Sequence, residues 1–384
     1  MNATSKRFNF VRVYSFPSIQ LNHREVLLDA ILRQSIQFKN DTEQPAVEFI
    51  KDWISGKEMF AFQTSGSTGT PKQFTFARWQ LQQSAARTVK ALGLTAGDQA
   101  LVCLNTRYVA GKMMLVRALK HNLGLTIIDP TANPFETLPT GYQPDFMAVV
   151  PLQLATLSEN PENHPRLNQM KAILVGGAPV SLSTVNKLQE LKCPIYETYG
   201  MTETLSNIAI RLINTPSKSH RFTPLEHVQV RTDQRSCLVI HDSIQKEPLI
   251  TNDIGEVHSN GTFTWLGRFD NVINTGGIKV HPEKIEQVLE ELLSQFKFTL
   301  NYFVGPLPDD RFGQIVTLFI DKNELLPENI DSILAKINSL PSSPEKPKKI
   351  ALARNWRLTE TGKTDRKRII STVSGSAAEL LTLS

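Results

Sequence analysis

The chain has 384 residues, of which 40% are hydrophobic and 21% are charged, and its formal net charge is +5. This composition is typical of a folded protein with room for two or three domains, and it excludes a disordered chain. The excess positive charge occurs in short basic runs without interleaved aromatic residues, so we expect no nucleic-acid partner.

Three cysteines, Cys103, Cys193 and Cys237, are widely separated and form no metal-ligand spacing. A sparse and odd number of cysteines favours reduced thiols and a cytoplasmic location. Residues 1–20 lack a continuous apolar core with a cleavage site, and no apolar run is long enough to cross a bilayer. We therefore expect a cytoplasmic protein without membrane insertion. The sequence indicates no oligomeric state.

The first quarter of the chain has a helical pattern. Apolar residues recur at helix spacing from residue 22 to residue 53, with a second helix expected around 45–54. After a loop rich in glycine and hydroxyl groups, residues 79–92 place four apolar side chains on one face of a helix that ends at Gly93.

Strands and helices then alternate. We expect strands over 100–104, 125–128, 146–150, 172–175 and 195–197, and helices over 113–121, after Pro151 and over 184–191. Such alternation favours a parallel α/β sheet, in which ligands bind beyond the carboxyl ends of the strands. Gly176-Gly177 and Thr198-Tyr199-Gly200 fall at such ends.

Beyond residue 208 the pattern becomes β-rich. Strands are expected over 228–231, 237–241, 255–258 and 262–266, with a hairpin turn at Asn260-Gly261. We place a domain boundary after Arg268, which gives an N-terminal domain of residues 1–268 and a C-terminal domain of residues 269–384. The second domain has an α+β pattern, with one helix beginning at Pro282 and another over 330–340.

The most informative segment is Thr64-Ser65-Gly66-Ser67-Thr68-Gly69-Thr70-Pro71-Lys72. Its glycines let backbone N–H groups approach an anion, and its hydroxyls and terminal ammonium add donors around the same charge. These features predict a loop that holds a polyphosphate. The spacing of a Walker P-loop is absent, and an ordinary turn is the alternative interpretation of this segment taken alone.

Three further segments follow in order. In Tyr199-Gly200-Met201-Thr202-Glu203-Thr204, a ring could stack on a base, a hydroxyl could bind a phosphate oxygen and a carboxylate could bind a divalent cation. Asp253 and Arg268 could hold ribose hydroxyls, and Lys363 lies on a glycine-bearing loop near the C-terminus. Taken singly, these segments are equally consistent with a capped helix start, a linker and a surface lysine.

Together, the four ordered segments resemble the adenylate-forming superfamily of acyl-CoA synthetases, adenylation domains and luciferases, over about residues 60–370. The resemblance implies a large N-terminal domain of parallel sheets flanked by helices, with a β-rich subdomain. It also implies a small, mobile α+β C-terminal domain that carries the catalytic lysine. The expected reactants are a small carboxylic acid, ATP with Mg²⁺, and CoA as co-substrate.

The resemblance also implies a role for each matching position. Thr64, Ser65, Gly66, Ser67, Thr68, Gly69 and Lys72 would hold the ATP phosphates, and Gly177, Ala178, Pro179, Glu197, Thr198, Tyr199 and Gly200 would line the adenine. Thr202 would meet the α-phosphate, Glu203 would bind Mg²⁺, and Asp253 and Arg268 would hold the ribose. Asp270 would be the hinge, Gly276 and Gly277 would line the pantetheine tunnel, and Lys363 would bridge the carboxylate and the α-phosphate.

The chain departs from the family pattern in three places. The phosphate-loop segment begins at residue 64, which implies a shortened N-terminal region. Thr251-Asn252-Asp253 replaces the usual Thr-Gly-Asp but keeps the acid. Tyr108 stands where many members have a histidine, which puts the family's aromatic gating of acyl entry in doubt.

The segment from Arg107 to Met114, with the short length, resembles compact o-succinylbenzoate–CoA ligases of menaquinone biosynthesis. That acid carries an aromatic ring and a second carboxylate, which Arg107 or Lys112 could neutralise beside Tyr108. For both cations, a solvated position on a helix surface is the alternative interpretation.

The predicted function is therefore an acid–CoA ligase that forms an acyl-adenylate and then a thioester. Two alternatives stay open. One is a stand-alone adenylation enzyme that loads another acid onto CoA or a carrier protein. The other is a catalytically inactive adenylate-binding scaffold.

Overall fold

The computed structural model describes residues 16–64, 72–139, 141–214, 219–293, 300–324, 327–341, 343–359, 364–374 and 379–383. The chain divides into two compact units. The first contains the chain up to Gln229 together with His241–Leu249, and the second contains Val230–Ile240 and the chain from Ile250 onward. In the described ranges, no helix is both long enough and apolar enough to cross a membrane.

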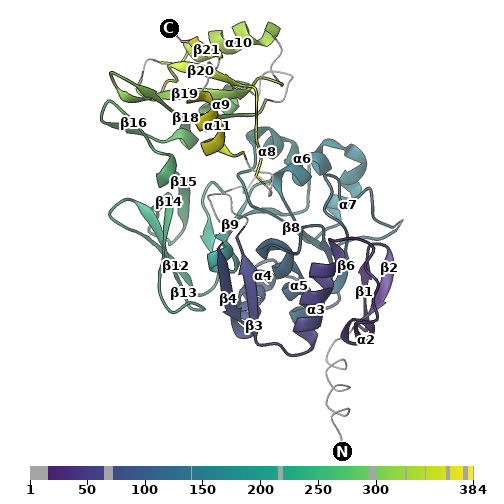
Figure 1. Ribbon diagram of the computed structural model, residues 1–384. Coiled ribbons are helices and arrows are strands. Elements are labelled where there is room, and N and C mark those ends of the chain that lie inside the picture. Colours follow the sequence, from purple (N-terminus) through teal and green to yellow (C-terminus); the bar gives the residue numbers. More distant parts are fainter. Residues whose placement is uncertain are drawn as a thin grey trace, which may run out of the picture. The chain divides into compact units, whose positions relative to one another are not determined.

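A large sheet forms the centre of the first unit, and nine of its strands lie in the described residues (Figure 1). The run β9–β8–β7–β5–β6–β1 is parallel, and antiparallel strands extend both edges. The expected parallel α/β sheet is confirmed. The strands are β1 (Ser18–Leu21), β2 (Arg24–Leu27), β5 (Gln99–Val102), β6 (Gly124–Ile127), β7 (Phe146–Val149), β8 (Ala172–Val175), β9 (Ile195–Met201), β10 (Ser206–Leu212) and β11 (Thr223–Pro224).

Two layers of helices cover opposite faces of this sheet (Figure 1). Side chains alternate along each strand, so in β5 Ala100 and Val102 join one core while Leu101 joins the other. Burial on both faces is what a parallel sheet requires. One layer contains α3 (Glu43–Ile54), α4 (Arg78–Ala91) and α5 (Val109–His121), and the other contains α6 (Pro151–Glu159), α7 (His164–Asn168) and α8 (Leu182–Leu188).

Local sequence signals explain where two of these helices begin. Pro151 occupies the first turn of α6, where its missing N–H leaves no hydrogen bond unmade. Ser181 caps α8, because its hydroxyl accepts a hydrogen bond of 3.1 Å from the Thr184 N–H.

The N-terminal strands correct the helix expected from residue 22. Ser18–Leu21 and Arg24–Leu27 pair in an antiparallel hairpin, and the connecting Asn22 and His23 have φ values of 43° and 66°. Two consecutive left-handed residues are typical of a type I′ hairpin turn. Leucines that match a helical spacing are thus divided between the end of a strand and the short helix α2 (Leu28–Leu32).

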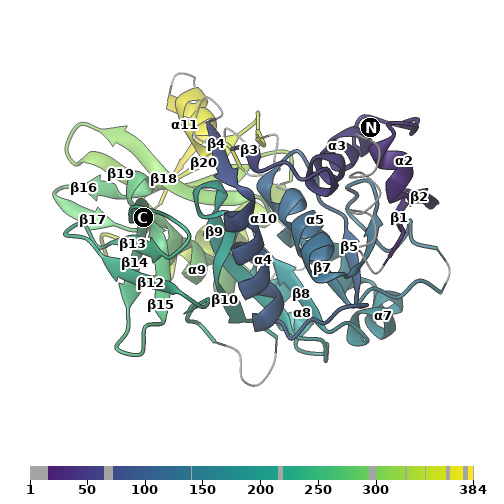
Figure 2. The ribbon, with the colours of Figure 1, turned by 90° about the horizontal axis from the view of Figure 1, so that it is seen from below.

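The second unit contains most of a four-stranded sheet in the order β12–β13–β14–β15 (Figure 2). These strands are β12 (Val228–Thr232), β13 (Cys237–Asp242), β14 (Leu249–Val257) and β15 (Phe263–Arg268). The expected hairpin is present, with Asn260 and Gly261 between the paired strands β14 and β15.

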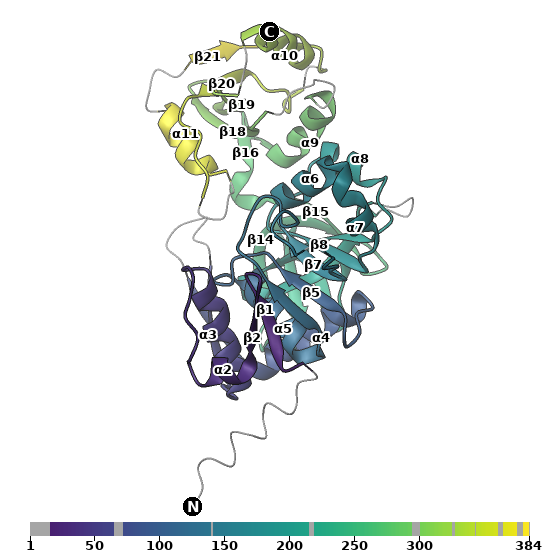
Figure 3. The ribbon, with the colours of Figure 1, turned by 90° about the vertical axis from the view of Figure 1, so that its right-hand side faces the viewer.

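The rest of the second unit is an α+β module, as expected. Its sheet contains β16 (Ile273–Thr275), β17 (Ile278–Val280), β18 (Tyr302–Asp309), β19 (Gly313–Asp321), β20 (Lys349–Ala353) and β21 (Glu379–Thr382). On one face α9 (Pro282–Leu293) and α10 (Pro327–Asn338) form a core, and on the other α11 (Arg366–Ser374) forms a second core (Figure 3). Helices α9 and α10 are the two that the sequence predicts.

The compact units do not divide at Arg268. Strands β14 and β15 cluster with the α+β module, and the Glu283 carboxylate of α9 accepts hydrogen bonds from the Arg268 N–H (3.4 Å) and the Asn271 amide (2.7 Å). These bonds tie the end of β15 to α9. A mobile C-terminal domain that begins at residue 269 stays a prediction.

Candidate active site

The expected phosphate loop connects two paired strands, β3 (Met59–Gln63) and β4 (Gln73–Ala77). The ladder continues for one more pair, because the Thr64 N–H donates to the Lys72 carbonyl oxygen and the Lys72 N–H donates to Thr64 Oγ1, both at 2.9 Å. Both ends of the loop are therefore fixed. Ser65, Gly66, Ser67, Thr68 and Gly69 lie outside the described residues, so their contacts with phosphate stay a prediction.

The segment Gly177-Ala178-Pro179 follows the carboxyl end of β8, and Gly177 and Pro179 are exposed there. The neighbouring Thr198 on β9 donates from Oγ1 to the Val175 carbonyl oxygen at 3.1 Å. A Cβ atom at residue 176 would lie 2.2 Å from that hydroxyl oxygen, so glycine is required at this position. The carboxyl end of β8 thus lies close to β9, and the segment that follows β8 is accessible at Gly177 and Pro179.

Tyr199 and Gly200 lie inside β9, which continues to Met201 and not to residue 197 as expected. Gly200 therefore serves a close approach of strands and not a turn, because a Cβ atom there would lie 2.1 Å from the Ser206 carbonyl oxygen of β10. The ring of Tyr199 is nearly buried and lies 5.9 Å from the ring of Phe222, tilted by 54°.

Glu197 is buried and paired across the ladder with Arg211 of β10. Its Oε2 accepts from Arg211 Nε at 2.8 Å and from Nη2 at 2.6 Å. The Arg211 guanidinium also lies 4.7 Å from the ring centroid of Phe222. The carboxylate of Glu197 thus orders this strand pair, and its place beside an adenine stays a prediction.

Thr202 and Glu203 form the short helix η2 (Thr202–Thr204), which Thr204 holds by accepting the Met201 N–H at 2.9 Å. The N-cap position of this helix is Met201, whose side chain makes no capping hydrogen bond. In the described part of the chain, no residue bonds the buried Thr202 hydroxyl or the half-buried Glu203 carboxylate.

The side chains at Glu203 fit a magnesium ion that the protein holds through a single carboxylate. Among the described residues, no three His, Cys, Asp or Glu side chains gather as a metal site. Mg²⁺ is commonly held by one or two carboxylates while substrate phosphates and water complete its shell. A single carboxylate beside a hydroxyl matches that pattern and excludes an all-protein cage in this part of the structure.

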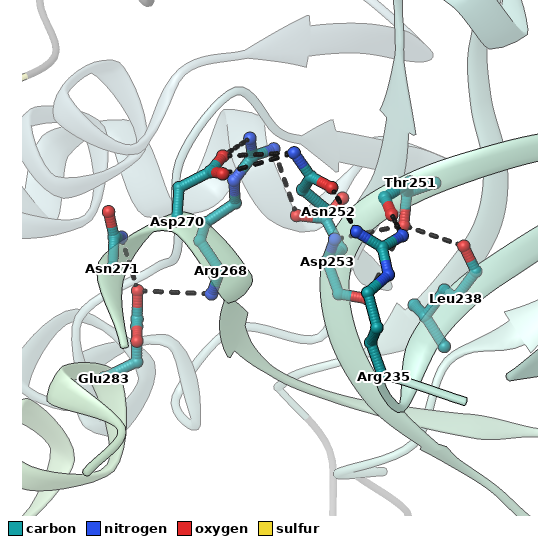
Figure 4. A network of polar contacts seen from close by, with 9 residues as sticks. All are labelled: Arg235, Leu238, Thr251, Asn252, Asp253, Arg268, Asp270, Asn271 and Glu283. Atoms are coloured by element: carbon teal, nitrogen blue, oxygen red, sulfur yellow. Dashed lines mark hydrogen bonds and ion pairs between the residues drawn. The ribbon is translucent and has the colours of Figure 1, made fainter. Parts of the chain in front are cut away.

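Asp253 and Arg268 face each other directly across the β14–β15 ladder (Figure 4). Arg268 Nη1 lies 3.3 Å from Asp253 Oδ1, and Nη2 lies 2.8 Å from Oδ2 of Asp270. Partial burial lowers the pKa of Arg268, but the two carboxylates outweigh it and the net shift is upward. The structure thus brings together the two residues predicted to hold ribose.

A hydrogen-bond network surrounds the backbone of Asp253 (Figure 4). Thr251 Oγ1 donates to the Leu238 carbonyl oxygen at 2.8 Å and accepts the Asp253 N–H at 3.0 Å. Arg235 donates to the Thr251 carbonyl oxygen and to Asn252 Oδ1, each at 3.2 Å. Asn252, which stands where the family usually has glycine, adds a bond of 3.2 Å from its amide to Asp270.

The remaining C-terminal candidates are a pair of glycines and a lysine. Gly276 and Gly277 form the exposed turn between β16 and β17, where the Gly276 N–H donates to the Phe312 carbonyl oxygen at 2.9 Å. Lys363 lies outside the described residues, and the positions that flank it, Leu358 and Thr364, form an antiparallel bridge. The pantetheine and lysine roles stay predictions.

The three residues expected near the acid differ in their surroundings. Arg107 is exposed and donates to the Asp41 carbonyl oxygen at 3.4 Å, and Tyr108 precedes α5. Lys112 Nζ donates to the Ala61 carbonyl oxygen at 2.9 Å and lies 5.1 Å from the Phe62 ring centroid. Burial, and then the charge of Lys57, lower the pKa of Lys112. Its ammonium already stabilises β3, and a substrate role stays a prediction.

One buried residue escapes sequence reasoning. Arg117 is only 1% exposed, although its helix α5 is otherwise apolar around it, from Met113 to Leu119. The signal in the sequence is a single arginine inside the run Met-Met-Leu-Val-Arg-Ala-Leu. A cation enclosed by apolar residues is a candidate for function because burying it is costly.

Residues 23–267 match the AMP-binding enzyme family. This chain belongs to that family. The AMP-binding enzyme is 37% identical to the acyl-CoA synthetase (AMP-forming)/AMP-acid ligase II-like protein from Dyadobacter fermentans, and the two align over 89% of this chain and 97% of the other with a TM-score of 0.59. The family that the sequence motifs predict is confirmed.

Two other comparisons concern ligases of a single acid. This chain is 25% identical over 330 residues to the 2-succinylbenzoate–CoA ligase of Lactococcus lactis. That alignment covers 81% of this chain and 71% of the relative. The o-succinylbenzoate CoA synthetase from Bacillus subtilis, solved with its acyl-adenylate intermediate, is 15% identical and aligns over 94% of this chain and 97% of the other with a TM-score of 0.76. This second likeness shows a shared fold.

Proposed function

We propose that this AMP-binding enzyme is an AMP-forming acid–CoA ligase, and that its acid is 2-succinylbenzoate. The observation that carries the proposal is the pair Thr202 and Glu203, which directly follow β9 of the parallel sheet and whose side-chain oxygens have no partner in the described residues. The Lactococcus lactis relative supplies the reaction and the acid, because it is a 2-succinylbenzoate–CoA ligase.

The first half-reaction joins the acid to AMP. A carboxylate oxygen attacks the α-phosphorus of ATP, and the bond to the β-phosphate breaks with release of pyrophosphate. The attack brings two anions together, so donors placed around the α-phosphate must offset the charge that develops. Thr202 would donate its hydroxyl to an α-phosphate oxygen, and the ring of Tyr199 would lie against the adenine.

Other groups hold the nucleotide in place. Glu203 would bind Mg²⁺, which supplies positive charge to the phosphates when it is present. Asp253 would accept the ribose hydroxyls and Arg268 would donate to the same sugar, while Lys363 would bridge the acid and the α-phosphate. In the second half-reaction the CoA thiol attacks the acyl carbonyl, AMP leaves, and a thioester forms.

The test is pyrophosphate release from MgATP across a panel of carboxylic acids, with and without CoA. We expect strong release with 2-succinylbenzoate and a thioester only when CoA is added. Lys363→Ala should slow release about 100-fold or more, because a removed charge-stabilising donor typically costs that much. Lys367→Ala, an exposed lysine on α11, is the matched control and should leave the rate unchanged.

Each alternative has its own result in this assay. Release with a different acid would keep the ligase mechanism and discard 2-succinylbenzoate. Release without a thioester in the presence of CoA would favour a carrier protein as the acceptor. No release with any acid would favour an adenylate-binding scaffold.

A further inference from the structure

The turn that carries Thr202 and Glu203 ends in an unusual backbone conformation. Leu205 and Ser206 come next in the chain with φ values of 53° and 81°, in the left-handed region that residues other than glycine rarely adopt. Leu205 is also fully buried. Such a conformation costs free energy and persists only where the surrounding structure holds it. The contacts that hold this turn therefore decide where Thr202 and Glu203 lie.

Two hydrogen bonds from other segments hold the backbone carbonyl groups of this turn. The Gln245 Nε2 donates to the Glu203 carbonyl oxygen at 2.5 Å, and the Ser84 Oγ donates to the Leu205 carbonyl oxygen at 2.8 Å. Ser84 lies on α4, Gln245 follows β13, and both belong to the first compact unit, as the turn does. The first bond thus holds the residue with the metal-binding carboxylate, and the second holds the first left-handed residue.

Gln80, in the first turn of α4, connects these contacts to the phosphate-loop hairpin. Its Oε1 accepts the N–H of Ala77, the last residue of β4, at 2.8 Å. Its Nε2 donates to the carbonyl oxygen of the buried Ile244 at 2.6 Å. That carbonyl belongs to the peptide group that joins Ile244 to Gln245. Two glutamine side chains and one peptide group therefore connect the end of β4 to the backbone of Glu203.

Both ends of this path lie at groups that would bind the magnesium complex of ATP. The hairpin of β3 and β4 carries the expected phosphate loop, and Glu203 would bind the ion. Mg²⁺ requires a nearly ideal octahedral arrangement of its oxygen ligands. Among the described residues no three metal-ligating side chains gather, so the position of the Glu203 carboxylate depends on its own backbone. Groups that hold this backbone prepare the site before ATP binds.

We propose that Gln80 and Gln245 are positioning residues that fix the Glu203 carboxylate relative to the phosphate-loop hairpin. This inference rests on the proposed function and deepens it, because it says what prepares the site for the magnesium complex of ATP. Neither glutamine contacts the nucleotide or the ion. Both act through the peptide group between residues 244 and 245 and through the Glu203 carbonyl oxygen.

The first test replaces one glutamine with an apolar side chain of similar length, Gln245→Met. The measured quantity is the affinity for α,β-methylene-ATP, an analogue that cannot release pyrophosphate, by calorimetry with and without Mg²⁺. We expect Mg²⁺ to tighten binding to the wild type, and this gain to fall about 3- to 10-fold in Gln245→Met, as the loss of one hydrogen bond implies. Equal gains in the wild type and the variant would overturn the proposal.

Gln189→Met is the matched control. The Gln189 Nε2 also donates to backbone carbonyl oxygens, those of Val185 at 2.8 Å and Ile213 at 3.1 Å, at the end of α8. Its loss should leave the gain from Mg²⁺ unchanged. The melting temperature of each variant is measured alongside. A lower melting temperature with an unchanged gain in Gln245→Met would make this glutamine purely structural and would overturn the proposal.

A second variant, Gln80→Met, tests the path from its other end and keeps the test decisive if Gln245→Met does not fold. We expect the same smaller gain from Mg²⁺, and a wild-type gain would overturn the proposal. In the double variant the loss should be no greater than in the more affected single variant, because both side chains act through one peptide group. Losses that multiply would show that the two glutamines act independently and would overturn the path.

Failure of this proposal can be told apart from failure of the proposed function, because binding of the analogue needs neither an acid nor CoA. If the wild type activates no acid but binds the analogue more tightly with Mg²⁺, the ligase proposal fails and the two glutamine variants still decide the positioning role. If Mg²⁺ leaves the affinity of the wild type unchanged, the positioning role is overturned even where the acid assay succeeds.

Discussion

At the scale of single residues, Asp253 and Arg268 are placed by the register of a hairpin. The two are opposite each other in the β14–β15 ladder, and the side chain of Asp253 is 9% exposed whereas that of Arg268 is 38% exposed. The arginine can reach solvent and a ligand, while the aspartate is held in place by its strand. An acceptor fixed in this way is suited to hydroxyl groups that must be bound in one orientation.

We expect Asp253→Asn to raise the KM for ATP about tenfold or more, since a hydrogen bond to a charged group contributes about 1.5–3 kcal/mol. The measurement is pyrophosphate release as a function of ATP concentration. Asp233→Asn is the matched control, because Asp233 pairs with Arg235 at 2.8 Å in the turn that connects β12 to β13 and has no predicted ribose contact. Equal ATP affinity in the wild type and Asp253→Asn would remove Asp253 from the nucleotide site.

The cations near the acid show how burial changes an interpretation. Arg107 and Lys112 stand beside the motif in sequence, but Arg107 is exposed and Lys112 is engaged with β3. Arg117 lies farther along the same helix and is the fully buried one of the three. The sequence shows only how far each cation lies from the motif. The structure also shows whether the charge is buried, and a buried charge is the one that costs free energy.

At the scale of elements, α11 is attached to α9 by an ion pair. Arg366, the first residue of α11, donates to Glu286 through two parallel contacts of 2.8 and 2.9 Å, and Glu286 also accepts the Val304 N–H at 2.8 Å. Burial raises the pKa of Glu286 even though Arg366 opposes the shift. Because α11 begins three residues after Lys363, this pair fixes the C-terminal end of the segment that carries the predicted catalytic lysine.

Glu286→Ala should loosen α11. Removing one partner of a largely buried pair leaves the other charge uncompensated, and partial exposure of Arg366 reduces the cost to about 2 kcal/mol. Hydrogen exchange of the backbone amides in Arg366–Ser374 measures this as faster opening. Lys367→Ala, on the exposed face of the same helix, should leave the exchange unchanged. Identical exchange in the wild type and Glu286→Ala would show that the pair does not anchor the helix.

At the scale of the whole molecule, the second compact unit joins the four-stranded sheet to the α+β module. The connection is made by Glu283, which accepts bonds from the Arg268 N–H and the Asn271 amide on either side of the predicted hinge Asp270. A hinge must exchange such bonds when it moves, so the Glu283 carboxylate contributes to its resting stability together with the contacts of Asp270 itself.

We expect Glu283→Ala to speed cleavage by trypsin after Arg268, because the backbone there loses its acceptor and opens more often. Mass spectrometry should detect the fragment that begins at Phe269. Glu283→Gln keeps an accepting oxygen and should be cleaved at close to the wild-type rate. If Glu283→Ala is cleaved no faster than the wild type, the Glu283 contact does not stabilise the hinge.

The sequence by itself determined the family, the alternation of strands and helices, and the helices at Pro151 and Pro282. Those features follow from local periodicity, from proline and glycine, and from motifs that lie in consecutive residues. The hairpin at Ser18–Leu27 is local as well, but its leucines also fit a helix, and only pairing of β1 with β6 decides between the two.

Tertiary structure alone decided which polar groups are paired. Asp253 opposite Arg268, Glu197 opposite Arg211, and Arg117 without a described counter-ion all depend on register and on packing between residues far apart in sequence. The free energy of a charge depends on what surrounds it, and a linear sequence does not specify those surroundings.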